Sequence, residues 1–223
     1  DAWHSELKNN GLTPHGPATS RKLIRRAYLT LIGIPPPPEQ INAFLDDKDP
    51  DAFSKVIDQL LESKHYGERW ARHWLDVARF GESHGYESDN ERPTAWTYRD
   101  AVIRALNEDM PFDRFVRWQV AGDVLQGDDP LASALTGFIT SGSTVTNVDG
   151  VDREKATYDK MDDIVSATGS AFLGLTIGCA RCHDHKYDPI SQEDYYRLVG
   201  FFLPGKAGDR NIAMGDSGNN VKG

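Results

Sequence analysis

The sequence predicts an all-α protein, an irregular set of helices joined by long loops. Apolar residues recur at three- and four-residue intervals in several segments, which is the spacing of amphipathic helices. Helix start and stop signals flank these segments, and no alternation of strands and helices of the βαβ kind is visible. The chain has 223 residues, 39% of them hydrophobic, with 5 Trp, 9 Phe and 8 Tyr. Such a composition is typical of a globular protein that buries a sizeable core.

Three short helices are predicted in the first third of the chain. The first starts at Thr19 or Ser20 and ends at Gly33, because glycine favours the position just after a helix. Pro38, the last of a proline run, starts the second helix, since proline suits a first helical turn. Asp49 is expected to cap the third. Their apolar stripes are, in order, Leu23, Ile24, Ala27 and Leu31; Ile41, Phe44 and Leu45; and Phe53, Val56, Ile57, Leu60 and Leu61.

The middle of the chain is predicted to hold three further helices, over residues 68–80, 98–106 and 112–120. A polar, glycine-bearing loop over 81–94 separates the first two and is long enough to suggest a function. The weaker apolar segment 131–139 leads into a second loop. Aromatic side chains of this region either frame a pocket or form ordinary core. They include Trp70, Trp74, Trp96 and Trp118.

Two helices are predicted toward the C-terminal end. A long helix spans residues 153–173, although Gly169 weakens it. The last helix starts at Ser191, because the stretch from Ser191 to Asp194 resembles a capping box. The predicted organisation is a single helical domain over residues 1–204, followed by a flexible tail or a linker to a further domain over 205–223.

Charge and hydropathy exclude two classes of protein. The formal net charge of -9 argues against nucleic-acid binding, because phosphate groups require a basic face. The longest apolar run, around residues 28–34, is too short and too polar to span a membrane. The stretch that begins at Asp1 does not have the pattern of a signal peptide, so we expect a mature or trimmed chain.

Both cysteines lie in one stretch, Cys179-Ala180-Arg181-Cys182-His183. This C-x-x-C-H pattern is typical of covalent c-type haem attachment. Two thiols three positions apart on a helical turn can each add to one vinyl group of the same porphyrin, and His183 can then reach the iron from one face. The predicted cofactor is therefore one covalent haem c near the C-terminus, held by Cys179 and Cys182, with His183 as the proximal axial ligand.

Three other uses of the motif stay open. The cysteines could form a reactive dithiol, since the nearby cation Arg181 favours a thiolate. They could hold a metal ion together with His183 and His185, although ligands so close in sequence would strain the loop. They could form a structural disulfide, although a bridge between residues three apart restricts very little of the unfolded chain.

The second axial position of the iron decides what the haem can do. A His or Met ligand there gives six-coordinate iron suited to electron transfer, whereas an open face permits small-molecule binding and catalysis. His73, beside two tryptophans on an apolar helix face, is the predicted distal ligand, and Met161 is the alternative. A hydrogen-bonded core histidine explains His73 equally well, whereas a methionine in the place of Met161 is more often core filler than ligand. His185 follows His183 too closely to cross to the opposite face, and His84 lies in the polar loop.

Charged residues supply two further sets of candidates. Cations could pair with haem propionates, and the acidic residues of the segment 153–173 could bind a hard cation such as calcium. Solvated surface charge explains the acidic residues equally well, and it is the better explanation for each cation taken singly. The cations are Arg72, Arg99, Arg181 and Lys186, and the acids are Asp159, Asp162 and Asp163.

Six segments together resemble the planctomycete-type cytochrome c domain family, of the second type. The resemblance runs from about residue 23 to residue 202, and its most specific part is 174–190. It implies export, a multidomain parent protein and a redox role. Related domains occur in large exported proteins of planctomycetes and their relatives, in gene surroundings that include sulfatases and glycan-degrading enzymes. The segments are LIRR (23–26), GIPP (33–36), GERWARHWLD (67–76), YRD (98–100), GD (122–123) and GLTIGCARCHDHKYDPI (174–190).

The sequence therefore predicts a periplasmic or extracellular c-type haem domain that transfers electrons within a larger redox protein, with a link to polysaccharide degradation implied by the resemblance. The expected partner is a redox protein or an adjacent domain of the parent chain. Two alternatives remain: a haem enzyme with an open distal site, and a non-haem scaffold domain that uses the C-x-x-C-H segment for a metal or a disulfide. No catalytic residue is assigned.

Overall fold

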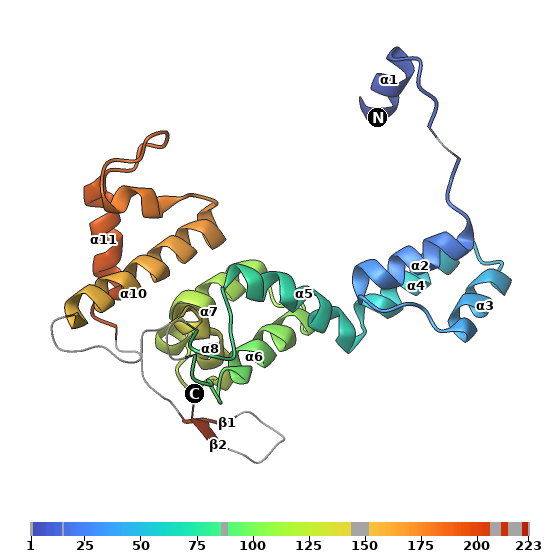
Figure 1. Ribbon diagram of the computed structural model, residues 1–223. Helices are drawn as coiled ribbons and strands as arrows, with labels where there is room; N and C mark the ends of the chain where they lie inside the picture. The colour runs from blue at the N-terminus through green and yellow to red at the C-terminus, as the bar shows by residue number, and fades with distance from the viewer. Residues whose placement is uncertain are drawn as a thin grey trace. The chain divides into compact units, whose positions relative to one another are not determined.

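The computed structural model describes residues 2–14, 16–85, 89–143, 152–205, 211–213 and 220–222. The chain forms two compact units, Asp1–Tyr66 and Gly67–Gly223. The described residues are helices and loops except for one short antiparallel pair, β1 (Asn211–Ala213) and β2 (Asn220–Lys222) (Figure 1), so the predicted all-α class is confirmed. The prediction of a single domain over 1–204 stays a prediction. Most of the predicted tail, residues 206–210 and 214–219, lies outside the described part of the chain.

The described part of the first unit contains α1 (Ala2–Asn9), α2 (Ser20–Leu31), α3 (Pro38–Asp46) and α4 (Ala52–Leu61). Local signals set most of these bounds. Gly33 takes a left-handed φ of 75°, and its N–H donates to the Tyr28 carbonyl at 3.0 Å, which ends α2 as a glycine can. Pro38 is the first residue of α3, as predicted. The predicted cap at Asp49 is wrong: Asp51 is the residue that precedes α4, and the Asp49 carboxylate accepts from its N–H at 2.8 Å.

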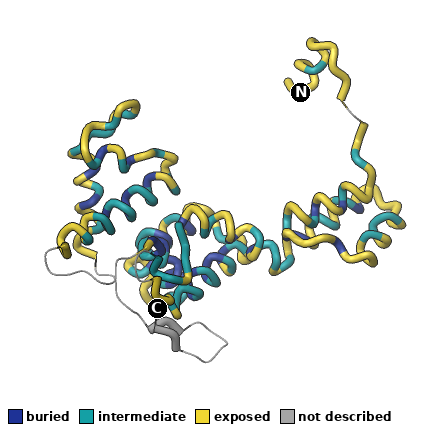
Figure 2. Tube along the Cα trace, viewed as in Figure 1, coloured by how far each residue is buried: buried dark blue, intermediate teal, exposed yellow. Residues whose placement is uncertain are grey.

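The second unit has two apolar clusters, built from the helices that follow. Buried and exposed positions alternate along these helices (Figure 2). The aromatic core joins α5 to α9 and takes in side chains of η1, and the C-terminal core joins α10, η2 and α11. The bounds are α5 (Lys64–Val77), α6 (Trp96–Asn107), α7 (Phe112–Leu125), α8 (Pro130–Leu135), α9 (Gly137–Thr140), α10 (Arg153–Thr168), the π-helical turn η1 (Gly169–Leu173), the 3-10 helix η2 (Ile177–Arg181) and α11 (Gln192–Phe202).

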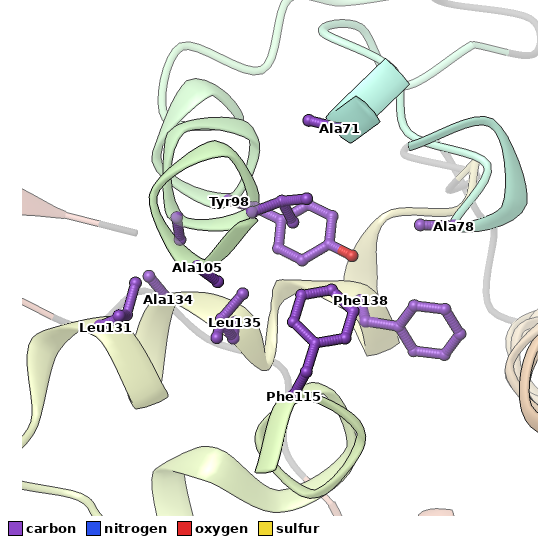
Figure 3. Packing of buried hydrophobic residues seen from close by; sticks show 11 residues of the cluster. Ala71, Ala78, Tyr98, Ala105, Phe115, Leu131, Ala134, Leu135 and Phe138 are labelled. Carbon is purple, nitrogen blue, oxygen red and sulfur yellow. The ribbon is translucent and has the colours of Figure 1, made fainter. Parts of the chain in front are cut away.

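Figure 3 shows Tyr98 of α6, Phe115 of α7 and Phe138 of α9 converging in the aromatic core. The indole ring of Trp74 packs against the Phe115 ring at 4.9 Å between centroids. Its N–H donates to the Tyr98 hydroxyl at 2.9 Å, and that hydroxyl donates to Oε1 of Gln119 at 2.7 Å. Burial raises the pKa of Tyr98 above its usual value, so the hydroxyl keeps the proton that it donates.

Gly122 allows α7 and α8 to approach closely. A Cβ at this position would lie 2.2 Å from the Ala132 carbonyl oxygen, which belongs to backbone and cannot move aside as a side chain can. We expect Gly122→Ala to lower the free energy of unfolding by about 1–3 kcal/mol, measured by urea denaturation. Gly200→Ala is the matched control, because Gly200 lies inside α11 with open space around it. Alanine there should stabilise by about 0.5–1 kcal/mol, and equal effects of the two substitutions would contradict the packing argument.

The predicted long helix over 153–173 is α-helical over its first 16 residues and differs only in its last five. The α-helix α10 ends at Thr168, and the chain continues as the π-helical turn η1 before Gly174 ends it with a φ of 65°. At this change Gly169 allows close contact with a residue outside the helix, because a Cβ there would lie 2.6 Å from the Ile177 side chain.

Two further features of the second unit bear on the site. An ion pair joins the two clusters: Arg79, which follows α5, donates from Nε to Oδ1 of Asp163 on α10 at 2.7 Å. The capping box at the start of α11 is confirmed, since the Ser191 hydroxyl accepts from the Asp194 N–H at 3.1 Å and the Asp194 carboxylate accepts from the Ser191 N–H at 3.1 Å. Among the helices of the described ranges, none combines the length and apolar character that a membrane span needs.

Candidate functional site

The C-x-x-C-H segment is carried by the 3-10 helix η2. Side chains three positions apart in such a helix lie above one another. Ile177 and Ala180 therefore share the face that is buried in the C-terminal core. Cys179, within η2, and Cys182, the residue that follows it, share another face, and both are exposed free thiols. The short helix thus presents the two sulfur atoms on one side of the segment and anchors itself on the other.

His185 closes the loop that contains the motif. Its side chain is only 5% exposed. Its Nδ1 accepts from the backbone N–H groups of Asp188 at 2.9 Å and Tyr187 at 3.3 Å, so Nδ1 carries no proton and Nε2 does. Nε2 then donates to the Thr176 hydroxyl at 3.2 Å, just before η2. The Asp188 carboxylate also lies 3.2 Å from Nδ1. The loop over residues 176–185 is therefore tied at both ends.

Arg181 points away from the face that carries the cysteines. Its guanidinium donates to Asp159 at 2.8 Å and to Asp162 at 3.1 Å, both on α10. The sequence offered Arg181 as a partner for a haem propionate, whereas the structure pairs it with these two carboxylates. Its backbone carbonyl accepts from the Gln192 amide at 3.0 Å and from the Tyr196 hydroxyl at 3.3 Å, both on α11.

His183 is exposed and is held by its own neighbour. Its Nδ1 lies 2.8 Å from the Asp184 carbonyl oxygen. Because a carbonyl can only accept, Nδ1 is the donor, and in the neutral tautomer this leaves the lone pair of Nε2 available to a metal. A metal-ligating histidine has this arrangement, with one ring nitrogen donating to a carbonyl and the other facing the metal. Two thiols on one face followed by such an imidazole fit the attachment chemistry of a haem c.

The two distal candidates lie in different surroundings. His73 is an exposed residue of α5, with its ring 5.4 Å from that of Trp70. Met161 is 7% exposed and packs in the C-terminal core together with Ile177 and Ala180. It therefore lies beneath the buried face of η2 and not on the face that carries the cysteines. The assignment of either residue as an iron ligand stays a prediction.

The acidic cluster of α10 forms ion pairs with arginines. Asp159 and Asp162 bind Arg181, and Asp163 binds Arg79. Within the part of the chain that the structure describes, no group of three or more His, Cys, Asp or Glu side chains is arranged to hold a metal ion. The calcium site considered from the sequence therefore has no support in this cluster.

Asp159 makes the stability of this region depend on pH. Hydrogen bonds from Lys155 and Arg181 hold the pKa of its carboxyl below the usual value. A lowered folded-state pKa contributes stability that is present above the unfolded value of about 3.9 and is lost as the pH falls through the folded value. We expect Asp159→Asn to lower the free energy of unfolding by less than about 1 kcal/mol at pH 7, since the pair is partly exposed. The difference between the two chains should disappear toward pH 2 in urea melts, and a difference that stays constant with pH would contradict this.

The tryptophans do not gather around the motif. Trp74 belongs to the rim of the aromatic core, and Trp70 contacts His73. Trp118 lies under the guanidinium of Arg114, whose carbon is 5.9 Å from the ring centre. Arg114 and Trp118 both line an open hollow of about 640 Å³ along α7. No residue of the C-x-x-C-H segment lines that hollow.

Sequence reasoning missed the residues that hold the motif in place. Gln192 and Tyr196 donate to the Arg181 carbonyl, and Tyr195 donates to Asp162 at 2.6 Å. Only the capping box marked the start of α11. No pattern indicated that this helix would lie against a segment eleven to fifteen residues earlier.

Comparison with known proteins places the chain in a family. The family model PSCyt2, described as a protein of unknown function (DUF1549), matches residues 2–206. No curated protein and no solved structure matches the chain. The matched range contains all of the helices described above, the C-x-x-C-H segment included, and confirms the resemblance seen in the sequence. The chain belongs to the PSCyt2 family, the second type of planctomycete cytochrome c-like domain.

Proposed function

We propose that this chain is an exported c-type haem domain that transfers single electrons within a larger redox protein. The observation that carries the proposal is the C-x-x-C-H segment itself, with both thiols free and exposed on one face of η2. The attachment pattern and its presentation agree, because haem attachment needs both sulfur atoms to reach the same porphyrin.

His183 would be the proximal iron ligand. Its Nδ1–H donates to the Asp184 carbonyl at 2.8 Å, which fixes the tautomer and leaves Nε2 available. A hydrogen bond of this kind also makes the ligating nitrogen more basic. When bound, the haem iron would accept and release one electron at a time, with a potential set by its axial ligands and surroundings.

The location and partner follow from the same proposal. Covalent haem attachment of this type takes place outside the cytoplasm, so the domain would work in the periplasm or outside the cell. The electron partner would be an adjacent domain of the parent protein or a separate redox protein. A role beside polysaccharide-degrading enzymes rests on the family resemblance alone.

Absorption spectroscopy tests the proposal. The chain is produced in a bacterial periplasm with a c-type maturation system, and spectra are recorded in the oxidised and reduced states. We expect a Soret band that stays with the polypeptide after acid–acetone extraction, and an intact mass raised by one haem. A colourless chain with the mass of the bare polypeptide would refute the proposal.

One observation favours a second candidate, a haem enzyme with an open distal face. Met161 is buried beneath η2, and His73 is an exposed residue of α5 in a different part of the second unit. A five-coordinate iron binds carbon monoxide readily, whereas a six-coordinate iron with His or Met on both sides resists it. Adding carbon monoxide to the reduced pigment separates the two candidates: a rapid shift of the Soret band supports the enzyme, and an unchanged spectrum supports the electron carrier.

A further inference from the structure

Arg181, the residue between the two cysteines next to Cys182, is fixed at both its side chain and its backbone. Its guanidinium binds two carboxylates of α10, Asp159 at 2.8 Å and Asp162 at 3.1 Å. Charge-assisted hydrogen bonds of this kind are short and directional. The Arg181 side chain is 34% exposed, and those of Asp159 and Asp162 are 40% and 29% exposed, so the ions are only partly screened by solvent.

One of the two carboxylates, that of Asp162, also accepts a hydrogen bond from a residue of the C-terminal core. The Tyr195 hydroxyl of α11 donates to Oδ1 of Asp162 at 2.6 Å, and Tyr195 is 2% exposed in the C-terminal core. Burial, together with this hydrogen bond to a carboxylate, raises the pKa of Tyr195, so its hydroxyl remains a donor. Asp162 therefore links Arg181 to a rigid part of the core.

The backbone around Arg181 is tied to α11. The Arg181 carbonyl accepts from the Gln192 side-chain amide at 3.0 Å and from the Tyr196 hydroxyl at 3.3 Å. The Asp184 carboxylate accepts from the Gln192 backbone N–H at 2.8 Å. The pair Cys182–His183 thus lies between two anchored residues, Arg181 before it and Asp184 after it.

From these contacts we infer that Arg181 is a positioning residue: it holds the C-x-x-C-H segment on α10 and α11 in the haem-free chain, so that both thiols and His183 are presented before any haem is bound. The inference deepens the proposed function, because the segment that Arg181 positions is the proposed attachment site. It rests on contacts within the polypeptide, however, and applies to the chain without haem.

Hydrogen exchange on the full chain, made without haem maturation and kept reduced, tests the inference. The amides to follow are those of Cys179 and His185, which donate to Thr176 at 3.2 Å and to Ile190 at 2.8 Å. Arg181→Gln should speed their exchange at least about tenfold, because local opening controls exchange of protected amides. Arg181→Lys, which keeps the charge, should restore part of the protection.

Two variants complete the design. Arg197→Gln is the matched control, because Arg197 pairs with Glu193 and Asp194 on α11 and touches nothing in the motif; it should leave both amides unchanged. Tyr195→Phe removes only the hydroxyl that holds Asp162 and should speed exchange about threefold by the same local opening. This milder variant carries the test if the Arg181→Gln chain does not fold.

Two results would overturn the inference: exchange of both amides in Arg181→Gln equal to that in Arg197→Gln, or an increase that extends equally to the buried amides of α6, which would indicate general destabilisation. The proposed function fails separately. A chain that shows the expected exchange but gains no pigment in a periplasm would refute haem attachment and leave the role of Arg181 intact.

Discussion

If the chain carries a haem c as proposed, replacing Cys179 and Cys182 together with alanine will remove the covalent pigment from the matured chain while leaving its helices intact. The haem content should fall from about one per chain to none, because no other cysteine is present to form a thioether. The fold should survive, since both side chains are exposed and contribute little to packing. We expect the free energy of unfolding of the haem-free chain to change by less than about 0.5 kcal/mol.

The haem content is read from the reduced spectrum after acid–acetone extraction, and the fold from circular dichroism. Tyr187→Ala serves as the control, because the Tyr187 side chain lies in the same loop, four positions beyond His183, and is 83% exposed, so this variant should keep its full pigment. Covalent haem in the double variant would show that the two cysteines are not the attachment points. Loss of pigment in both variants would point to damage of the loop as a whole.

Phe138→Ala will cause the largest loss of stability among single substitutions in the aromatic core. Phe138 is fully buried, with ring centroids of Phe172 at 5.0 Å and Trp74 at 5.9 Å. The Arg79 guanidinium lies 5.6 Å above the same ring, so the substitution also weakens the surroundings of the ion pair to Asp163. Removing a buried phenylalanine leaves a cavity and costs about 3–5 kcal/mol.

Urea unfolding of the haem-free chain, followed by circular dichroism, measures this effect. Phe201→Ala is the matched control, because Phe201 on α11 is 80% exposed, and it should change stability by less than about 0.5 kcal/mol. A loss below about 1 kcal/mol for Phe138→Ala would mean that the core collapses around the missing ring or that Phe138 is not packed as described.

Local signals were sufficient for much of the helical pattern. Gly33 ends α2, Pro38 starts α3, and the capping box at Ser191 starts α11. Each of these works through hydrogen bonds or backbone angles within a few residues, so the sequence around it contains the whole cause. Predictions that depended on distant partners were less accurate. The α-helix expected over 153–173 ends at Thr168 and continues as a π-helical turn, where Gly169 contacts Ile177, a residue outside the helix.

The same distinction between local causes and distant partners applies to the candidate site. The residue types and spacing of Cys179, Cys182 and His183 were visible in the sequence, because the attachment pattern is local. The direction of Arg181 was not, because its partners on α10 lie 19 and 22 residues earlier in the chain. The weak apolar pattern over 131–139 did not predict the two short helices α8 and α9, whose buried side chains belong to the aromatic core.

The exposed thiol pair has a consequence for how this domain would be made. Under the proposed role, the polypeptide crosses the membrane with both sulfur atoms bare and enters a compartment that favours disulfides. Cys179 and Cys182 share one side of a 3-10 turn, so each is the other's readiest oxidation partner. A bridge between them would block both positions at once, so ligation competes in time with oxidation. Production of the mature pigment would therefore depend on a reductant outside the cytoplasm that keeps both sulfur atoms as thiols until the porphyrin arrives.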